Sequence, residues 1–117
     1  YKDGKIYFHC AKNGHKLDAI KQNKKVSFCV IEKDEVDSEK LTTLFRSVVV
    51  FGKAEIMENE EKINSAMLSF GLKYNNDINA VKKEIERERS GLCCVEITIE
   101  HITGKQAIEL VKTKTIL

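Results

Sequence analysis

The feature that most restricts the fold of this chain is a long β-type run, residues 42–57, with apolar side chains on both faces. Successive side chains of a strand point to opposite faces of the sheet. One parity carries Leu44, Arg46, Val48, Val50, Ala54 and Ile56, and the other carries Phe45, Ser47, Val49 and Phe51. A strand covered on both faces is typical of a barrel or a dimer. Gly52 falls inside the run, where a long barrel strand can bulge or coil.

The rest of the chain alternates strand-like and helix-like segments. We expect strands near residues 5–10, 26–31 and 93–101, and helices near residues 15–22, 59–71 and 77–89. Charged residues 32–41 are expected to form a surface loop, Thr103 and Gly104 a turn, and the tail from Lys105 a strand or an extended arm. The resulting order, β-α-β-β-α-α-β plus a tail, predicts an α+β fold with a mainly antiparallel sheet.

The last two helical segments carry recognisable start signals. Asn59 and Asp77 stand where N-cap residues are expected, and Gly71 is expected to end the first of the two helices. Apolar residues at helical spacing predict the buried faces, which are Ile63, Ala66, Met67 and Phe70 in the first helix and Ile78, Val81 and Ile85 in the second.

Length and composition indicate one folded, soluble domain over residues 1–117. Apolar residues make up 42% and charged residues 32%. No apolar run approaches the roughly 20 residues that a membrane helix needs. The 20 basic residues are interleaved with 18 acidic ones, so the net charge of +2 does not indicate nucleic-acid binding.

The cysteines and the first residues favour a cytoplasmic protein. Cys10, Cys29, Cys93 and Cys94 lack CxxC spacing, which fits reduced thiols in the cytosol. The chain starts at Tyr1 and enters a strand almost at once, without the charged and apolar regions of a signal peptide. We therefore expect it to lack its natural N-terminus.

A candidate phosphate site lies between the first strand and the first helix. Asn13, Gly14, His15 and Lys16 lead into a helix N-terminus, where backbone N–H groups and positive charge favour an anion. The alternative is that Gly14 only turns the chain and that Lys16 is a solvated surface residue. Arg46 is too costly to bury alone, so it has to reach the surface, an ion pair or an anion.

His9 is the side chain with the widest choice of chemistry. It could donate a hydrogen bond to a ligand, shuttle a proton or bind a metal, or it could be a packed or surface histidine. The histidines and cysteines show no zinc-ligand spacing, so the sequence predicts no metal site. No GxSxG motif, reactive cysteine context or Gly-rich nucleotide loop is present.

Several segments together indicate a family. The segment GKIYFHCAKNGHKLDAIKQNKKVSFCV, followed by FRSVVVFGKAEI and then ITGK, resembles the pyridoxamine 5'-phosphate oxidase-like flavoproteins, in particular their nitroimidazole-resistance and flavin-nucleotide-binding branch. The resemblance covers nearly the whole chain. It implies a split β-barrel of Greek-key type with a few flanking helices, usually a homodimer with FMN in each of two interface clefts. Family members begin with a helix and a strand hairpin that this sequence lacks.

The resemblance also implies cofactor-binding residues. It places His9, Cys10 and Ala11 along the flavin, and His15 and Lys16 on its phosphate. Relatives often have arginine where this chain has His15, and histidine lacks the bidentate geometry of a guanidinium.

In the long strand, the resemblance implies that Arg46 and Ser47 reach the cofactor, and that Gly52 and Lys53 match a Gly-Lys step. The C-terminal ELVKTKTIL lacks the arginine-rich substrate segment of the true pyridoxamine phosphate oxidases, so the nitroimidazole-resistance branch fits better. In that branch the histidine that matches His9 assists reduction of a nitro group.

The implied function is an FMN-dependent oxidoreductase that takes electrons from a pyridine nucleotide or another reductant and reduces a small acceptor such as a nitroaromatic compound. One alternative is a non-catalytic module that stores or senses flavin, deazaflavin or haem, with His101 as a candidate haem ligand. Another is a cofactor-free dimerisation domain in which the long strand pairs two subunits.

Overall fold

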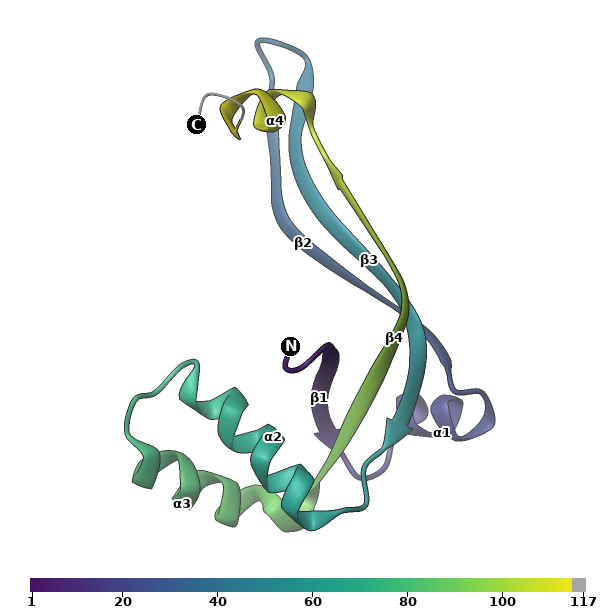
Figure 1. The fold of residues 1–117 in the computed structure, drawn as a ribbon, viewed down its shortest axis with the longest axis vertical. Coiled ribbons are helices and arrows are strands. Elements are labelled where there is room, and N and C mark those ends of the chain that lie inside the picture. Colours follow the sequence, from purple (N-terminus) through teal and green to yellow (C-terminus); the bar gives the residue numbers. More distant parts are fainter. Residues whose placement is uncertain (115–117) are drawn as a thin grey trace. The chain divides into compact units, whose positions relative to one another are not determined.

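The computed structural model of the protein describes residues 1–114. The elements are β1 (Lys5–Ala11), α1 (His15–Gln22), β2 (Lys25–Asp37), β3 (Thr42–Ile56), α2 (Glu60–Leu72), α3 (Ile78–Glu88), a short 3-10 helix (Arg89–Gly91), β4 (Leu92–Gln106) and α4 (Ile108–Lys114) (Figure 1). The predicted order of strands and helices is therefore confirmed as far as β4.

The four strands form one sheet in the order β1-β4-β3-β2. The consecutive strands β2, β3 and β4 are neighbours, and β1 returns beside β4, which is a Greek-key order. β1 and β4 run antiparallel, with Tyr7 opposite Glu96 and His9 opposite Cys94. The expected α+β class with a mainly antiparallel sheet is confirmed.

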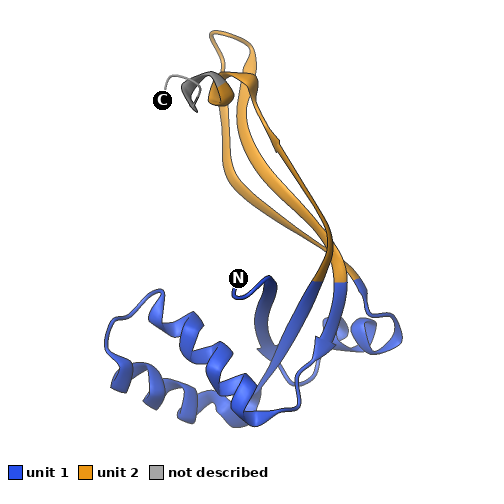
Figure 2. Cartoon of the chain, viewed as in Figure 1, with its two compact units in different colours: residues 1–25, 53–98 blue, residues 26–52, 99–117 orange. Residues whose placement is uncertain are grey.

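The chain divides into two compact units, which Figure 2 shows in different colours. Unit 1 comprises residues 1–25 and 53–98, and unit 2 comprises residues 26–52 and 99–117. The strands β3 and β4 each contribute residues to both units, whereas α1, α2 and α3 belong to unit 1. Each unit is thus built on a different part of the same two strands.

The core of unit 1 forms where α2 packs on β4. Ile63, Ala66 and Met67 of the helix contact Leu92 and Cys94 of the strand, and all five are buried. The spacing of the three helical residues places them on one face of α2, as the sequence predicted. Burying side chains of this kind typically stabilises a fold by about 1.5–3 kcal/mol each.

The ends of α2 and α3 differ in part from expectation. Asn59 and Asp77 both accept hydrogen bonds from backbone amides, so the two predicted N-caps are confirmed. Gly71 does not end α2, because the helix continues to Leu72. A Cβ atom at position 71 would overlap a methyl group of Val81, so this glycine permits the close approach of α2 to α3.

Two residues predicted to be buried are exposed. Phe70 and Ile78 each keep 44% of their surface accessible, while Val81 is buried. On β4, the structure buries the neighbouring residues Cys94 and Val95, which point to opposite faces. The sequence pattern could not show this, because Cys94 is covered by α2 from a distant part of the chain.

Unit 2 buries little apolar surface. Among the described residues, its buried apolar side chains are Val50 and Ala107. Val30 and Ile31 are neighbours on β2 and therefore point to opposite faces, yet both are exposed. None of the helices in residues 1–114 combines the length and the apolar character needed to cross a bilayer.

The predicted surface loop at residues 32–41 is largely wrong. β2 continues through these charged residues to Asp37, and the connection to β3 is confined to residues 38–41. The strand persists because its backbone is paired with β3, while charged side chains such as Glu32 and Lys33 take part in ion pairs. Leu41 has a positive φ of 52° and lies in the tight connection.

The predictions for the end of β4 also need correction. Thr103 and Gly104 do not turn the chain, because β4 runs on to Gln106 in its place beside β3. Of the predicted tail, Lys105 and Gln106 do belong to the strand, but the amide of Ala107 then donates to the carbonyl of Phe45 at 2.9 Å and α4 follows at Ile108 instead of a strand or an extended arm. Residues 115–117 of that predicted tail lie outside the described residues.

Candidate functional site

The predicted phosphate segment connects β1 to α1 within unit 1. Residues 12–14 form a bend, and α1 begins at His15 as expected. Leu17 and Ile20 are the buried residues of the helix, so its opposite side stays in solvent. This anchoring holds His15 and Lys16 in the first exposed turn.

The N-terminus of α1 offers backbone donors. The first hydrogen bond of the helix runs from the amide of Asp18 to the carbonyl of Gly14 at 3.2 Å. The amides of His15, Lys16 and Leu17 come before this bond and donate to no carbonyl within the helix. Within the described residues, no side chain caps this helix. Uncapped N–H groups at a helix N-terminus form a preferred site for phosphate or another anion.

Gly14 leaves open space in front of these donors. Its φ of 165° and ψ of 165° describe extended backbone that any residue can adopt. A Cβ atom at this position would meet nothing within 4 Å. Neither backbone conformation nor packing within the protein therefore requires glycine, and a ligand can approach the backbone closely here.

Basic side chains gather at the same turn, which also carries the acidic side chain of Asp18. Lys16 is exposed and forms no ion pair with another described residue, and its Nζ lies 5.4 Å from the centroid of the Phe8 ring. His15 and Lys12 are also exposed. The uncapped amides and this set of side chains match the donor chemistry that a dianionic phosphate requires.

The three predicted flavin-lining residues do not share one face of β1. His9 and Ala11 point to one face and Cys10 to the other, because the side chains of a strand alternate. His9 lies opposite Cys94 on the face that α2 covers, and its ring centroid is 5.4 Å from that of Phe70 at an interplanar angle of 84°. Phe8, which contacts Lys16, points to the same face as Cys10.

The structure therefore places the imidazole of His9 and the ammonium group of Lys16 on opposite faces of β1. β1 is an edge strand of the sheet. A single ligand that touches both side chains has to pass around this edge. Sequence spacing alone could not show this division.

A groove of about 500 Å³ opens beside His9. Its walls include Met67 and Phe70 of α2 and Val81 and Glu84 of α3. Tyr74 lies at the same groove, with its ring centroid 5.5 Å from that of Phe70. Phe70 and Tyr74 were not predicted as site residues, although their spacing of four residues places them on one side of the helix end.

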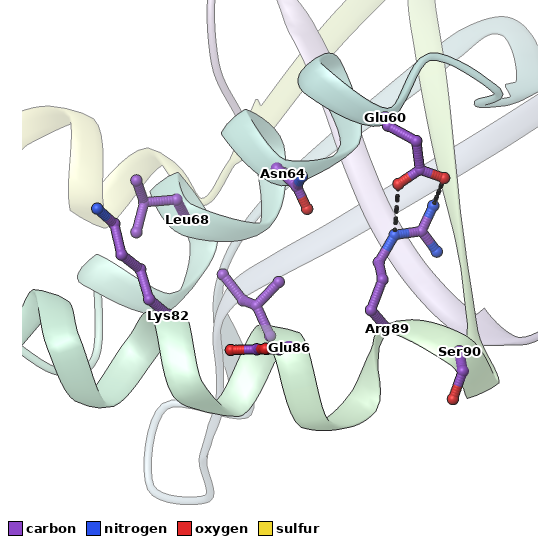
Figure 3. Close-up of a pocket in the computed structure, with 8 residues that line it drawn as sticks. Glu60, Asn64, Leu68, Lys82, Glu86, Arg89 and Ser90 are labelled. Atoms are coloured by element: carbon purple, nitrogen blue, oxygen red, sulfur yellow. Dashed lines mark hydrogen bonds and ion pairs between the residues drawn. The ribbon is translucent and has the colours of Figure 1, made fainter.

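A second cavity, of about 630 Å³, lies along the other side of α2 and α3 (Figure 3). It contains none of the predicted site residues. The guanidinium of Arg89 donates to both carboxylate oxygens of Glu60, at 2.7 Å and 3.1 Å. This ion pair joins the start of α2 to the end of α3, and Lys82 and Glu86 of α3 also line the cavity.

A hydrogen-bonded network lies on the same face of β1 as His9. The hydroxyl of Tyr7 donates to Glu96 at 2.9 Å, and Nζ of Lys5 donates to the other oxygen of Glu96 at 2.9 Å. Burial, with help from this bond to Glu96, raises the pKa of Tyr7 to about 12. Burial alone would raise the pKa of Glu96, but the hydrogen bonds from Lys5 and Tyr7 outweigh it and lower that pKa.

Arg46 and Ser47, the other two predicted cofactor residues, lie in unit 2. Nη1 of Arg46 is 2.8 Å from a carboxylate oxygen of Glu32, and its Nε donates to Gln106 at 3.2 Å. The sequence required Arg46 to reach the surface, an ion pair or an anion, and the structure shows the ion pair. Ser47 is half-buried and points to the opposite face of β3. The predicted cofactor residues are therefore divided between the units. Arg46 and Ser47 belong to unit 2, and the others belong to unit 1.

His101, the candidate haem ligand, is exposed on β4 in unit 2. Its ring centroid lies 6.3 Å from that of Phe51 on β3. In the described part of the chain, no three or more histidine, cysteine or acidic side chains are grouped as metal ligands.

Solved structures of other proteins share this fold. A conserved hypothetical protein from Mycobacterium tuberculosis gives a TM-score of 0.71 at 21% identity, covering 89% of this chain and 62% of its own. A Bacteroides thetaiotaomicron protein named for 5-nitroimidazole antibiotic resistance gives 0.65 at 19% identity, with the same coverage of 89% and 62%. The FAD and haem binding protein from Mycobacterium smegmatis gives 0.61 at 15% identity, covering 92% and 55%.

These likenesses show the expected split-barrel fold. The chain spans 62% of the length of each of the first two proteins. No curated protein sequence matches it significantly. A family model for pyridoxamine 5'-phosphate oxidase, however, matches residues 1–106. Because this match covers most of the chain, the protein belongs to the pyridoxamine 5'-phosphate oxidase family.

Proposed function

We propose that the protein is an FMN-binding flavoprotein in which residues 1–117 act as one cofactor-binding domain. The observation that carries this proposal is the uncapped, basic N-terminus of α1, with open space at Gly14. A phosphate placed there accepts hydrogen bonds from the first amides of α1 and is paired with Lys16. His15 adds a further donor, although without the two parallel bonds that an arginine would supply.

His9 and Ala11 would hold the flavin with their side chains, while Cys10 would contribute its backbone because its thiol points to the opposite face of β1. Arg46 and Ser47 remain proposed cofactor residues of unit 2. Since Arg46 is already paired with Glu32, a bound phosphate has to compete with that carboxylate, and we expect its contribution to be smaller than that of Lys16.

We propose that the chemistry is reduction of a small acceptor such as a nitroaromatic compound. Bound FMN supplies the redox chemistry, and the protein supplies binding, orientation and access. The acceptor ring lies in the groove beside His9, where Phe70 and Tyr74 offer exposed aromatic surface. An imidazole nitrogen of His9 would hold the proton that the acceptor takes up, and a pyridine nucleotide would supply the electrons.

We propose a homodimer that works in the cytoplasm. The exposed apolar side chains on both faces of β2 in unit 2, Val30 and Ile31, support a second copy of the chain as the cover for these surfaces. A second subunit also offers a route to complete a cofactor site at an interface.

A haem-binding module is the second candidate function. His101 is exposed beside Phe51, so its imidazole would hold the haem iron and the Phe51 ring would add apolar contact. A member of the same fold from Mycobacterium smegmatis is named for binding both FAD and haem.

The test is the visible absorption and fluorescence of the purified protein, followed by titration of the flavin-free protein with FMN, FAD and riboflavin. We expect flavin absorption, and FMN binding that is tighter than riboflavin binding because of the phosphate. A Soret band without flavin would favour the haem module instead. Equal affinity for FMN and riboflavin would contradict phosphate binding at α1.

The variant Gly14→Ala tests the same site without disturbing the fold. Because a methyl group at position 14 meets no protein atom, we expect unchanged unfolding but weaker FMN binding. If flavin binds as proposed, anaerobic addition of reduced pyridine nucleotide and then a nitroaromatic compound separates an enzyme from a storage protein. Absence of turnover with every reductant would contradict the oxidoreductase assignment.

A further inference from the structure

We propose that Cys10 and Cys93 form a reversible disulfide through exchange with an anionic small-molecule disulfide. The exchange needs no bound flavin, although Cys10 also contributes its backbone to the proposed flavin site and Lys12 lies beside the proposed phosphate site. It rests on the pairing of β1 with β4 and on the charges beside Cys93.

The strand register places the two cysteines directly opposite each other. Cys10 of β1 pairs with Cys93 of β4 in the antiparallel ladder, so both thiols point to the same face. Directly opposite residues in such a ladder have Cα atoms about 4.5 or 5.5 Å apart, depending on the hydrogen-bonding position. Both spacings fall within the roughly 4.4–6.8 Å that disulfides span, so a bond needs no large backbone movement.

Both thiols are free and accessible to a reagent. Cys10 and Cys93 are unpaired cysteines with intermediate exposure. Cys94 is the neighbour of Cys93 but points to the opposite face, where it is only 2% exposed against α2. Cys29 is exposed on β2 in unit 2 and serves as an internal comparison.

The surroundings of Cys93 favour a negatively charged reagent. Cys93 lines a groove of about 440 Å³ together with Lys12 and Lys21. Glu60 and Arg89 line the same groove but neutralise each other through their ion pair. The remaining charge is positive, so an anionic disulfide such as oxidised glutathione is attracted to the thiol that it has to meet.

The reaction balances as two exchange steps. The thiolate of Cys93 attacks one sulfur of oxidised glutathione, the glutathione S–S bond breaks, and one glutathione leaves as a thiolate that takes up a proton. The thiolate of Cys10 then attacks the mixed disulfide at Cys93 and releases the second glutathione in the same way. Two electrons pass from the protein thiols to glutathione, and the protein loses two hydrogen atoms.

The test uses the purified protein incubated with excess oxidised glutathione, followed by intact mass measurement and peptide mapping without reductant. Burial, reinforced by the nearby Cys10, raises the pKa of the Cys93 thiol above its usual range, so mildly alkaline buffer is used to populate the thiolate. We expect a Cys10–Cys93 cross-link and a mass lower by two hydrogen atoms. Glutathione attached stably to both cysteines, or a lack of reaction while Cys29 is modified, would overturn the proposal.

Variants assign the steps. Cys10→Ser should trap one glutathione on Cys93, Cys93→Ser should abolish the cross-link, and Cys29→Ser should leave it intact. Replacing Lys12 and Lys21 with alanine should slow the reaction with oxidised glutathione several-fold at low salt but not the reaction with the cationic disulfide cystamine. Equal slowing with both reagents would contradict the charge argument. The wild-type peptide map decides the cross-link even if a variant fails to fold.

Discussion

Units 1 and 2 are built on the same two long strands but differ in how the strands are covered. In unit 1, α2 packs Ile63 and Met67 on β4, and most of the buried apolar residues in the described part of the chain lie there. Among the described residues of unit 2, Val50 and Ala107 are the buried apolar ones, while neighbouring residues of β2 are exposed on both faces. Apolar strand residues are therefore core in one unit and surface in the other.

The difference shows that burial in this protein depends on helices supplied from elsewhere in the chain. Sheet pairing satisfies the backbone in both units, but it does not by itself remove side chains from water. Unit 1 supplies its own cover, whereas unit 2 leaves apolar surface that we propose a second subunit covers. The following predictions test this contrast, and they start with the largest expected effect.

The core of unit 1 should be far more sensitive to truncation than the surface of unit 2. Ile63 is 2% exposed and Val36 is 78% exposed. We expect Ile63→Ala to lower the free energy of unfolding by about 2–4 kcal/mol, because it leaves a cavity. Val36→Ala should change it by no more than about 0.5 kcal/mol. Urea unfolding followed by circular dichroism measures both, and similar losses would contradict the contrast between the units.

The two units should also differ in their contribution to FMN binding. Lys16 is free to pair with a phosphate, so Lys16→Ala should lower FMN affinity by roughly 10- to 100-fold, the range for a hydrogen bond to a charged group. Arg46→Ala should have a smaller effect, since Glu32 already holds the guanidinium. Fluorescence titration gives the affinities. Lys25→Ala is the matched control, and an equal loss there would mean that overall charge, not a specific contact, attracts FMN.

The exposed surface of unit 2 should be needed for dimer formation. Ile31 is 64% exposed on β2. If a second subunit covers it, Ile31→Glu should raise the dimer dissociation constant at least about tenfold, equivalent to about 1.4 kcal/mol. Sedimentation velocity over a range of concentrations provides the measurement. Lys40→Glu in the adjacent connection is the control, and an unchanged constant for Ile31→Glu would place the interface elsewhere.

The smallest predicted effect concerns the alkaline stability of unit 1. The folded state raises the pKa of Tyr7 from 10.0 to about 12, so the neutral tyrosine stabilises the fold below pH 10. This contribution is lost as the pH rises from about 10 to 12. Tyr7→Phe should cost about 1 kcal/mol at neutral pH and should remove this part of the pH dependence.

Unfolding curves at several pH values compare Tyr7→Phe with Tyr74→Phe, which alters a tyrosine that is 79% exposed. The exposed control should keep the pH dependence of the wild type. The same dependence in Tyr7→Phe would show that Tyr7 does not cause it.

Local signals accounted for much of the fold. The caps at Asn59 and Asp77, the start of α1 at His15 and the long β3 run were all predicted, because each depends on a few neighbouring residues. The continuation of β2 through its charged segment was not predicted. Its side chains favour solvent, and only pairing with β3 keeps that backbone extended.

The site divides in the same way. The sequence alone determined the turn that offers Gly14, His15 and Lys16 at a helix N-terminus, since strand, turn and helix there follow from adjacent residues. Only the tertiary structure decided that Arg46 is held by Glu32 and that His9 faces Phe70. It also placed Cys10 opposite Cys93. These relations join residues distant in the chain, so they depend on strand register and helix packing, which no local pattern of residues contains.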